Sequence, residues 1–524
     1  MLDILLTQAP EPPIATPSVD YPAVLPMLIV FGAACVSVLV EAFAAKRSRF
    51  GLQVGLSLAA IVAAGVSLVV YATGSAPAGG VKTFSGAISI DKPALFLWGT
   101  LLALAVGAVL LISDRVVEPG GALVAQAGIR PGTIQDRAQQ TATVMQTEVF
   151  PLTLFALGGM MAFCASNDLL TMFIALEVLS LPLYLMCGLA RRRRLLSQEA
   201  AVKYFLLGAF SSAFFLYGLA LLYGYANSVK LADIAAAAAG SDRSDTLLFA
   251  GLGLLVVGLL FKGSVGPFHT WTPDVYQGAP TPVTAFMAAC TKVAAFGGIL
   301  RVLSVAFSST SWEWRGVLWG VAIISMVIGA VLGLTQTDVK RMIAYSSIAH
   351  AGFLLVGAIA MTRDGLSSTL FYLLAYGFTT LAAFGVISLV RDSSGEATHL
   401  SAWAGLAKRS PLVAGIFTFL LLALAGIPLT SGFVGKFVVF SAALSDGMAP
   451  LVVVALVFSA VAAFFYLRVI VLMYFSEPAA DGPSVSVPGF GTGTAIFLGT
   501  AVTLVLGLVP AFALGWAGAG GFAS

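Results

Sequence analysis

The sequence predicts an all-α, polytopic membrane protein with about 14 transmembrane helices and two inverted five-helix repeats, each with a broken helix. Three observations predict this fold class. Apolar residues make up 59% of the 524 residues and charged residues only 10%, with a mean hydropathy of +0.99, whereas soluble domains have about 25% charged residues. Apolar runs of about 20 residues, enough to span a bilayer, recur along the chain. Two of these runs are too long for one straight helix and contain Gly and Pro.

The predicted spans follow one another along the whole chain. They lie at 22–43, 52–73, 92–113, 148–166, 168–189, 199–226, 246–279, 280–304, 315–335, 340–361, 367–390, 411–443, 448–475 and 491–517. No Lys or Arg precedes Lys46, so the basic segment of a cleaved signal peptide is not seen. We therefore expect the first span to remain in the protein as a membrane anchor.

Basic residues orient the spans. Fifteen Lys and Arg fall in loops on one side of the predicted bilayer: Lys46, Arg47, Arg49, Arg115, Arg130, Arg137, Arg191, Arg192, Arg193, Arg194, Lys340, Arg341, Arg391, Lys408 and Arg409. Six fall in loops on the other side: Lys82, Lys92, Lys230, Arg243, Arg315 and Arg363. By the positive-inside rule the first set is cytoplasmic. Fourteen helices then place both termini outside.

The two over-long spans are predicted to be broken helices. The first contains FKGSVGPFHTWTPDVYQG (261–278) and the second GIPLTSGFVGKF (426–437). Irregular backbone at membrane depth is tolerated only beside protein or a water-filled cavity. Each broken span is the fourth of five helices, and the two sets start from opposite sides, which predicts an inverted repeat. We expect segments 1–147, 148–304 (first repeat), 305–475 (second repeat) and 476–524.

Spacing also relates the two repeats. Lys262 and Lys436, one on each broken span, are 174 residues apart. Glu177 lies 85 residues before Lys262, and His350 lies 86 before Lys436. This spacing pairs Glu177 with His350.

Ionisable residues inside the spans are the candidate functional residues. They are Glu177, Lys203, Lys262, Lys292, Arg301, Lys436 and Arg468. A lysine at the bilayer centre costs about 2.5–3.5 kcal/mol, so several of them predict a buried polar path. Burial disfavours the charged form of a lysine and a nearby carboxylate favours it. A lysine balanced between these effects can take up and release a proton, and a helix break can admit the water that supplies it.

Some of these residues also fit plainer roles. Lys203 fits a snorkelling lysine or a helix salt bridge with Glu199. Arg301 and Arg468 fit interfacial anchors, and His269 fits a hydrogen-bonded core histidine. Asp274 and Tyr276 fit capping or hydrogen-bonding groups. Lys262, Lys292 and Lys436 fit such roles least well.

Composition and motifs exclude several classes of function. The four cysteines are scattered and no CxxC occurs, so no disulfide framework, zinc site or iron–sulfur site is indicated. The three histidines are too far apart to indicate paired haem ligands. No P-loop or dinucleotide fingerprint is present, and a net charge of +3 does not indicate nucleic-acid binding. We expect no cofactor or metal in this chain.

Five segments resemble the antiporter-like membrane subunits of respiratory complex I, the proton-translocating NADH:quinone oxidoreductase. They are FIALEVLSLPLYLM (173–186), EAAVKYFLLGAFSSAFFLYG (199–218), FHTWTPDVYQGAPTPVTAF (268–286), DVKRMIAYSSIAHAGF (338–353) and IPLTSGFVGKFVVF (427–440). The form WTPDVYQGAPTPVTAF is similar to the N-type branch of that family. The resemblance runs from about residue 148 to about residue 475.

The resemblance implies a proton channel without its own redox centre. It implies a pathway through Glu177, Lys203, Lys262, His269, Lys292 and Lys436, with Glu177 and Lys262 as the coupling pair and Lys436 at the outlet. It also implies a multi-pass location in the bacterial cytoplasmic membrane, with other membrane and peripheral subunits and the lipid bilayer as partners. NADH, FMN, iron–sulfur clusters and quinone would belong to those other subunits. The Ala-, Gly- and Arg-rich composition suggests a GC-rich bacterium, and hence menaquinone.

Three alternatives stay open at this point. A subunit of a multi-component sodium/proton antiporter would share the fold and the lysines on broken helices. A related hydrogenase or dehydrogenase membrane arm would keep the proton path and change the electron donor. A purely structural scaffold conflicts with the cost of the buried charges. The loop at 114–147 is longer than the family pattern. Its mixed charge and Gly/Pro content indicate a cytoplasmic surface insertion, with a lineage-specific contact as the alternative.

Overall fold

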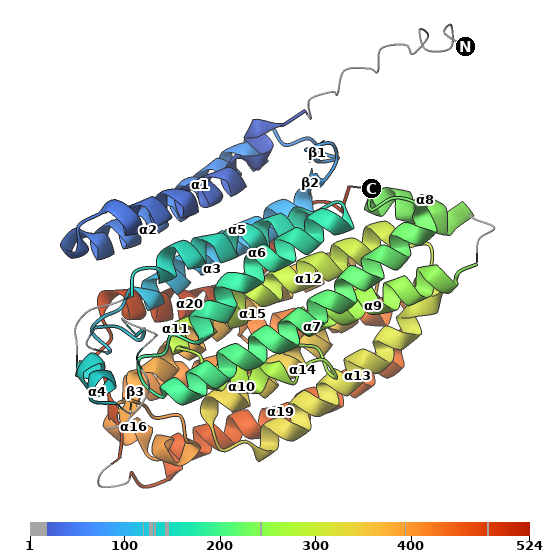
Figure 1. Ribbon diagram of the computed structural model, residues 1–524. Coiled ribbons are helices and arrows are strands. Elements are labelled where there is room, and N and C mark those ends of the chain that lie inside the picture. Colours follow the sequence, from blue (N-terminus) through green and yellow to red (C-terminus); the bar gives the residue numbers. More distant parts are fainter. Residues whose placement is uncertain are drawn as a thin grey trace, which may run out of the picture.

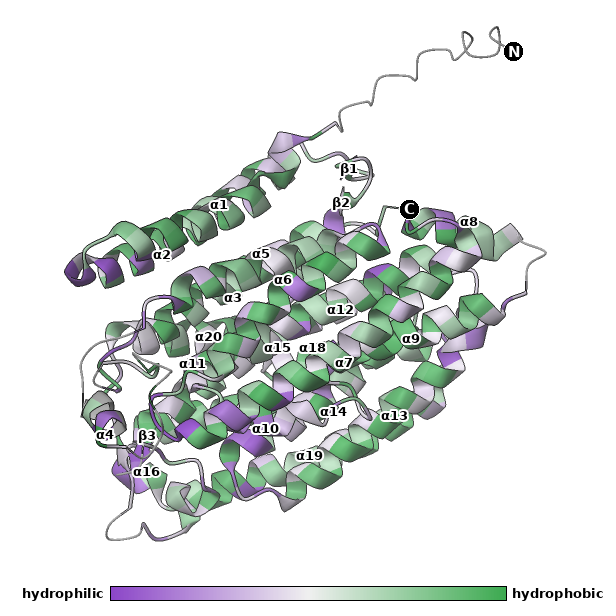
Figure 2. Ribbon diagram, viewed as in Figure 1, coloured by the Kyte–Doolittle hydropathy of each residue, from purple (hydrophilic) through white to green (hydrophobic). Residues whose placement is uncertain are grey.

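The chain folds into one bundle of helices that run side by side (Figure 1). The computed structural model describes residues 18–118, 120–124, 129, 133–141, 146–240, 244–392, 395–478 and 482–523. Arg130 and Arg243, two of the residues assigned above to loops, lie outside the described residues, as does part of the 114–147 loop. Figure 2 shows hydrophobic residues along the sides of the bundle and hydrophilic residues gathered mainly around α4, α16 and β3 at one end.

The N-terminal part contains α1 (Tyr21–Phe43), α2 (Lys46–Gly74), β1 (Val81–Thr83), β2 (Ile88–Ile90), α3 (Lys92–Ile112) and α4 (Ile134–Thr141). The first half of the bundle contains α5 (Val149–Ala165), α6 (Leu169–Cys187), α7 (Arg194–Ala226), α8 (Leu231–Gly240), α9 (Thr246–Lys262), α10 (Trp271–Gly278), α11 (Thr281–Phe286) and α12 (Lys292–Arg301). Two π-helical segments, η1 (Met287–Thr291) and η2 (Val302–Ala306), flank α12.

The second half contains α13 (Ser311–Thr335), α14 (Val339–Ile359), α15 (Arg363–Leu389), β3 (Val390–Asp392), β4 (Gly395–Glu396), η3 (Leu400–Trp403), α16 (Leu406–Arg409), α17 (Pro411–Ala425), α18 (Ser431–Ser445) and α19 (Ala449–Phe475). The C-terminal part contains β5 (Ser484–Val485), α20 (Phe490–Leu508) and α21 (Ala511–Ala517). Strands β1 and β2 form an antiparallel hairpin, and β4, β3 and β5 form a small antiparallel sheet in that order.

Every predicted span is helical. In the described part of the chain, 11 helices are long and apolar enough to cross a membrane. The remaining predicted spans are α5, which has 17 residues, and the two broken helices, α9–α10 and α17–α18. The chain is therefore a multi-pass membrane protein.

Loops gather at the two ends of the bundle. At one end, which we call the basic end, Glu118 pairs with Arg192 and Arg391, and Arg193 donates to Thr398. At the opposite end β2 bridges to Ser166. The first described residues, around Asp20, lie against β1, and the last described residues lie near α8 at this same end (Figure 1).

The 114–147 loop is not wholly a surface insertion, contrary to the sequence-based expectation. Glu118 is 7% exposed and is held by two arginines. Backbone hydrogen bonds join Val124 to Leu189 at 2.8 Å and Arg191 to Ala122 at 2.9 Å. This part of the loop packs between the α6–α7 connection and β3.

The two halves repeat the same helix pairs in opposite directions. α5 packs on α6 as α13 packs on α14, and α7 packs on α10 as α15 packs on α18. α5 begins at the basic end, whereas α13 begins at the opposite end. Asp168 and Asp338, which cap α6 and α14 by accepting from backbone N–H groups, lie 170 residues apart.

Two close glycine contacts show the same offset of 170 residues. A Cβ on Gly159 of α5 would lie 2.5 Å from Leu179 N, and a Cβ on Gly329 of α13 would lie 2.3 Å from Ala349 N. With this register, His350 corresponds to Ser180. The pairing of Glu177 with His350 from spacing alone is therefore wrong by three residues, about one helical turn.

Candidate functional site

A row of buried ionisable side chains lies inside the bundle. Lys262, Lys292, His350 and Lys436 are 5%, 2%, 2% and 6% exposed. Three of them belong to the predicted pathway. In the part of the chain that the structure describes, none of the three lysines has a carboxylate within 4.0 Å.

Lys262 is the last residue of α9, immediately before the first helix break. Its Nζ donates to Ser180 Oγ at 2.8 Å and to Tyr204 Oη at 3.0 Å. The Tyr204 ring stacks on Trp271 with centroids 4.5 Å apart. The Trp271 indole donates to Phe261 O across the break at 3.0 Å, so α10 is fastened to the end of α9 beside the ammonium.

Glu177 and Lys262 do not form a direct ion pair in the structure. Glu177 is half-buried on α6, one turn before Ser180, and accepts a hydrogen bond from Ser212 Oγ at 2.5 Å. Ser180, one turn after Glu177 on α6, is therefore the residue of this helix that binds Lys262.

Lys292 begins α12, directly after the π-helical segment η1. Its Nζ donates to the Ser347 carbonyl on α14 at 2.6 Å and lies 5.4 Å from the centre of the Tyr376 ring. π-helical turns free backbone groups and are frequent at functional sites. Here the segment precedes the lysine that contacts the second half of the bundle.

His350 is a buried residue that the sequence analysis did not include in the pathway. Its Nδ1 is 2.7 Å from Tyr372 Oη, and its Nε2 is 3.4 Å from Tyr466 Oη. Its ring centre lies 5.0 Å from that of Tyr376, the ring under Lys292. The sequence signal for His350 was its spacing of 86 residues before Lys436, close to the 85 residues between Glu177 and Lys262.

Lys436 lies on α18, after the second helix break. Its Nζ donates to the carbonyls of Leu424 and Ala425, at 3.0 and 2.8 Å, and to Ser459 Oγ at 2.9 Å. These carbonyls are left without helical N–H donors because α17 ends at Gly426, whose φ of +87° turns the chain away. The ammonium thus caps the negative end of the α17 dipole. A cleft of about 340 Å³ between α18 and α19 reaches Lys436.

Lys203 and His269 are less buried than the members of this row. The Lys203 side chain is 41% exposed and pairs with Glu199 and Asp274, both at 2.6 Å. Asp274 also pairs with Arg341 at 2.5 Å. His269 lies in the first helix break, half-buried, with its ring centre 6.4 Å from that of Tyr345.

Arg301 is not an interfacial anchor, contrary to the sequence-based expectation. It is fully buried and forms two hydrogen bonds of 2.9 Å to the carboxylate of Asp91 at the start of α3. Its guanidinium also lies 4.7 Å from the centre of the Phe522 ring, and Ala523 N donates to Asp91 at 3.1 Å. Arg468 is exposed and binds backbone carbonyls at the end of α13, as expected of an anchor.

Comparison with known proteins gives three concordant findings. The family model described as NADH:quinone oxidoreductase/Mrp antiporter, TM, matches residues 166–479. The NADH-quinone oxidoreductase subunit N of Saccharopolyspora erythraea is 75% identical over 511 residues, which cover 97% of this chain and 99% of that protein. A chain of respiratory complex I from Thermus thermophilus is 33% identical with a TM-score of 0.75, covering 95% of this chain and 100% of that chain.

A further solved structure shares the fold alone. A chain of the Mrp complex from a Dietzia species has a TM-score of 0.76 and 22% identity, covering 94% of this chain and 96% of that one. The fold is thus common to at least two kinds of membrane assembly, while the higher sequence identities are to subunit N.

Proposed function

We propose that this chain carries protons across the bacterial cytoplasmic membrane, because it belongs to the NADH:quinone oxidoreductase/Mrp antiporter family of membrane subunits, which includes subunit N. It does so as a membrane-arm subunit of an NADH:quinone oxidoreductase, coupled to NADH oxidation and quinone reduction in other subunits. The single observation that carries the proposal is the buried row of Lys262, Lys292, His350 and Lys436 between two broken helices.

The contacts of the row suit proton transfer. Burial disfavours a charged amine, and the three lysines are held by hydroxyl and carbonyl oxygens rather than by carboxylates. A strong fixed counter-ion would hold an ammonium in its charged form, whereas neutral oxygens allow the proton to leave. The row is also continuous in its second half, because Tyr376 contacts both Lys292 and His350, and Phe353 contacts both His350 and Lys436.

Coupling is proposed to be electrostatic. Quinone reduction elsewhere in the complex would change the charge near Glu177. Because Glu177 lies one turn from Ser180, and Ser180 binds Lys262, this change would favour or disfavour the charged form of Lys262. Protons would then move through Lys292 and leave near Lys436. Lys203 and His269 would serve the same path from its edge, through Asp274 and the first helix break.

The basic end is proposed to face the cytoplasm, as the positive-inside rule requires. Both described terminal segments lie at the other end, so both termini would be outside. The donor NADH, FMN, the iron–sulfur clusters and the quinone, proposed to be menaquinone, would be held by partner subunits. The two repeats would comprise residues 148–304 and 305–475.

The experiment that tests this function begins with the partners. An affinity tag would be added to the chromosomal gene for this chain. The protein would then be extracted in mild detergent, and its partners would be identified by mass spectrometry. Co-purification of flavin and iron–sulfur NADH dehydrogenase subunits, with NADH-driven proton uptake in vesicles, is expected. Recovery with antiporter subunits and sodium-dependent proton exchange without NADH would assign the antiporter function instead.

A further inference from the structure

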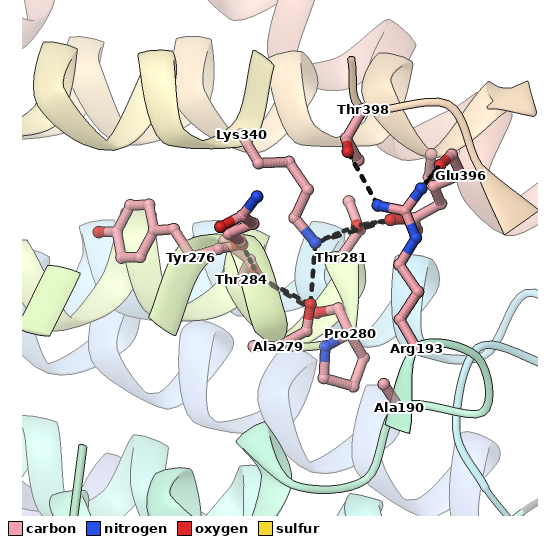
Figure 3. A network of polar contacts seen from close by, with 12 residues as sticks. Ala190, Arg193, Tyr276, Ala279, Pro280, Thr281, Thr284, Lys340, Glu396 and Thr398 are labelled. Carbon is pink, nitrogen blue, oxygen red and sulfur yellow. Dashed lines mark hydrogen bonds and ion pairs between the residues drawn. The ribbon is translucent and has the colours of Figure 1, made fainter. Parts of the chain in front are cut away.

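A small polar cavity lies at the basic end, where five segments of the chain meet. It has a volume of about 40 Å³. The described residues that line it are Glu118, Ala122, Ala190, Arg192, Arg193, Gln277, Gly278, Ala279, Pro280, Lys340, Arg391, Glu396 and Thr398. Such a volume holds one or a few water molecules and is too small for an organic ligand. Figure 3 shows the Lys340 amine beside Thr281, Glu396 and the Ala279 carbonyl.

Lys340 and Glu396 are joined through a threonine hydroxyl. Lys340 Nζ donates to Thr281 Oγ1 at 3.0 Å and to the Ala279 carbonyl at 2.9 Å, and lies 3.6 Å from Glu396 Oε2. Thr281 Oγ1 donates to Glu396 Oε2 at 2.5 Å. The hydroxyl therefore accepts from the amine and donates to the carboxylate at the same time, which is the connectivity of a proton relay (Figure 3).

The transfer balances without another reactant. When Glu396 is protonated and Lys340 is neutral, the carboxyl proton passes to Thr281 Oγ1 while the hydroxyl proton of Thr281 passes to Lys340 Nζ. One O–H bond breaks at each oxygen, and one O–H and one N–H bond form. The result is the carboxylate, hydroxyl and ammonium arrangement of the present structure.

Exposure falls from the mouth of the cavity inward. The Glu396 side chain is 18% exposed and that of Lys340 is 2% exposed. Arg193 holds the hairpin that carries Glu396 by donating to the Glu396 carbonyl at 2.8 Å. The other carboxylate of the cavity, Glu118, is bound by Arg192 and Arg391. Glu396 is thus the carboxylate that connects solvent to the buried lysine.

Both helices that hold this cluster lead to Lys292. Thr281 begins α11, which continues through η1 to Lys292. Lys340 lies in the first turn of α14, and the carbonyl of Ser347, seven residues further on, accepts from Lys292. Seven helical residues span about 10 Å, which a short chain of water molecules can bridge.

We propose that Glu396, Thr281 and Lys340 form an uptake relay that passes protons from the basic end to Lys292. This inference rests on the proposed proton-translocating function and adds to it the point where protons reach the buried row. The rival role is a purely structural one, in which the cluster only fastens the β3–β4 hairpin onto α11. Removal of the Thr281 hydroxyl distinguishes the two roles, because its oxygen is the bridge of the relay.

The test uses the whole complex in proteoliposomes. Thr281→Val removes the hydroxyl at almost constant volume and Thr281→Ser keeps it. Thr398→Val is the matched control, because Thr398 lines the same cavity and accepts from Arg193 outside the relay. We expect Thr281→Val to slow coupled turnover roughly ten-fold, as for the loss of one hydrogen bond in a rate-limiting transfer, with a larger solvent deuterium isotope effect. Thr281→Ser is expected to restore both values.

Two results would overturn the relay. One is wild-type turnover in Thr281→Val. The other is a fall in turnover with an unchanged isotope effect that Thr398→Val reproduces, which would show a structural role. Lys262→Met in the same series separates this inference from the function beneath it. Normal proton pumping in Lys262→Met would contradict the proposed function. Loss of pumping in Lys262→Met together with wild-type turnover in Thr281→Val would contradict the relay alone.

Discussion

The two broken helices place a lysine beside the break in different ways. Lys262 precedes its break and is bound by hydroxyls from neighbouring helices, Ser180 and Tyr204. Lys436 follows its break and is bound mainly by backbone carbonyls of its own first half-helix. A hydroxyl can both donate and accept, so it can serve an amine in either protonation state. A carbonyl only accepts, and the end of a helix favours a cation.

A lysine beside a helix break can therefore serve either of two roles. The surroundings of Lys262 suit a group that exchanges its proton at each cycle. Those of Lys436 suit a group that holds positive charge and releases it when its surroundings change. Both lysines would be indispensable, but they should differ in which substitutions they tolerate.

The largest expected effect is that of arginine at Lys262. Arginine keeps the charge but does not release its proton in proteins, so Lys262→Arg should abolish coupled proton pumping as fully as Lys262→Met. Lys436→Arg should retain part of the activity, because a charge at the end of α17 is preserved. Proton uptake by reconstituted complex, scaled to complex content, measures this. Equal loss of pumping in both arginine variants would contradict the different roles assigned to Lys262 and Lys436.

Ser180 binds Lys262 and Ser459 binds Lys436, and we expect alanine to lower coupled turnover more at Ser180 than at Ser459. Ser180→Ala leaves Lys262 with one hydroxyl partner, and a hydrogen bond to a charged group contributes about 1.5–3 kcal/mol. We expect coupled turnover to fall roughly ten-fold or more in Ser180→Ala. NADH oxidation by the same preparation with an artificial acceptor serves as the control, and it should not change.

A milder effect is expected from Gly426→Ala at the second break. The φ of +87° is costly for alanine by about 1–2 kcal/mol, and the new Cβ would lie 3.0 Å from Lys436 Cδ. We expect partial loss of pumping as Lys436 is displaced from the α17 carbonyls. Gly415→Ala on α17 is the control, because its Cβ would meet nothing within 4 Å. Equal behaviour of the two variants would show that the break does not position Lys436.

The smallest effect is expected from Ser459→Ala. Lys436 keeps both α17 carbonyls as acceptors, so turnover should fall by less than in Ser180→Ala, roughly two- to three-fold. The two variants would be assayed side by side in proteoliposomes. A larger loss in Ser459→Ala than in Ser180→Ala would reverse the roles assigned to the two breaks.

The sequence allowed the fold and the positions of both breaks to be predicted, because apolar run length and Gly–Pro content are local signals. The buried lysines were also recognisable, since a charge inside an apolar run is costly. The register between the repeats was not, because it depends on the caps at Asp168 and Asp338 and on close glycine contacts between helices. Arg301 was misassigned because its partner Asp91 is 210 residues away, and nothing in the local pattern indicates it.

The Asp91–Arg301 pair has a consequence for biosynthesis. Asp91 enters the membrane region long before Arg301 is made, and the backbone amide of Ala523, which also binds Asp91, follows 432 residues after it. Until then the carboxylate lacks donors that it has in the finished protein. Among the described residues, only the neighbouring donors Ser89 Oγ and Ala94 N are at hand before that. The final set of contacts around Asp91 therefore forms only after the last helices have been made.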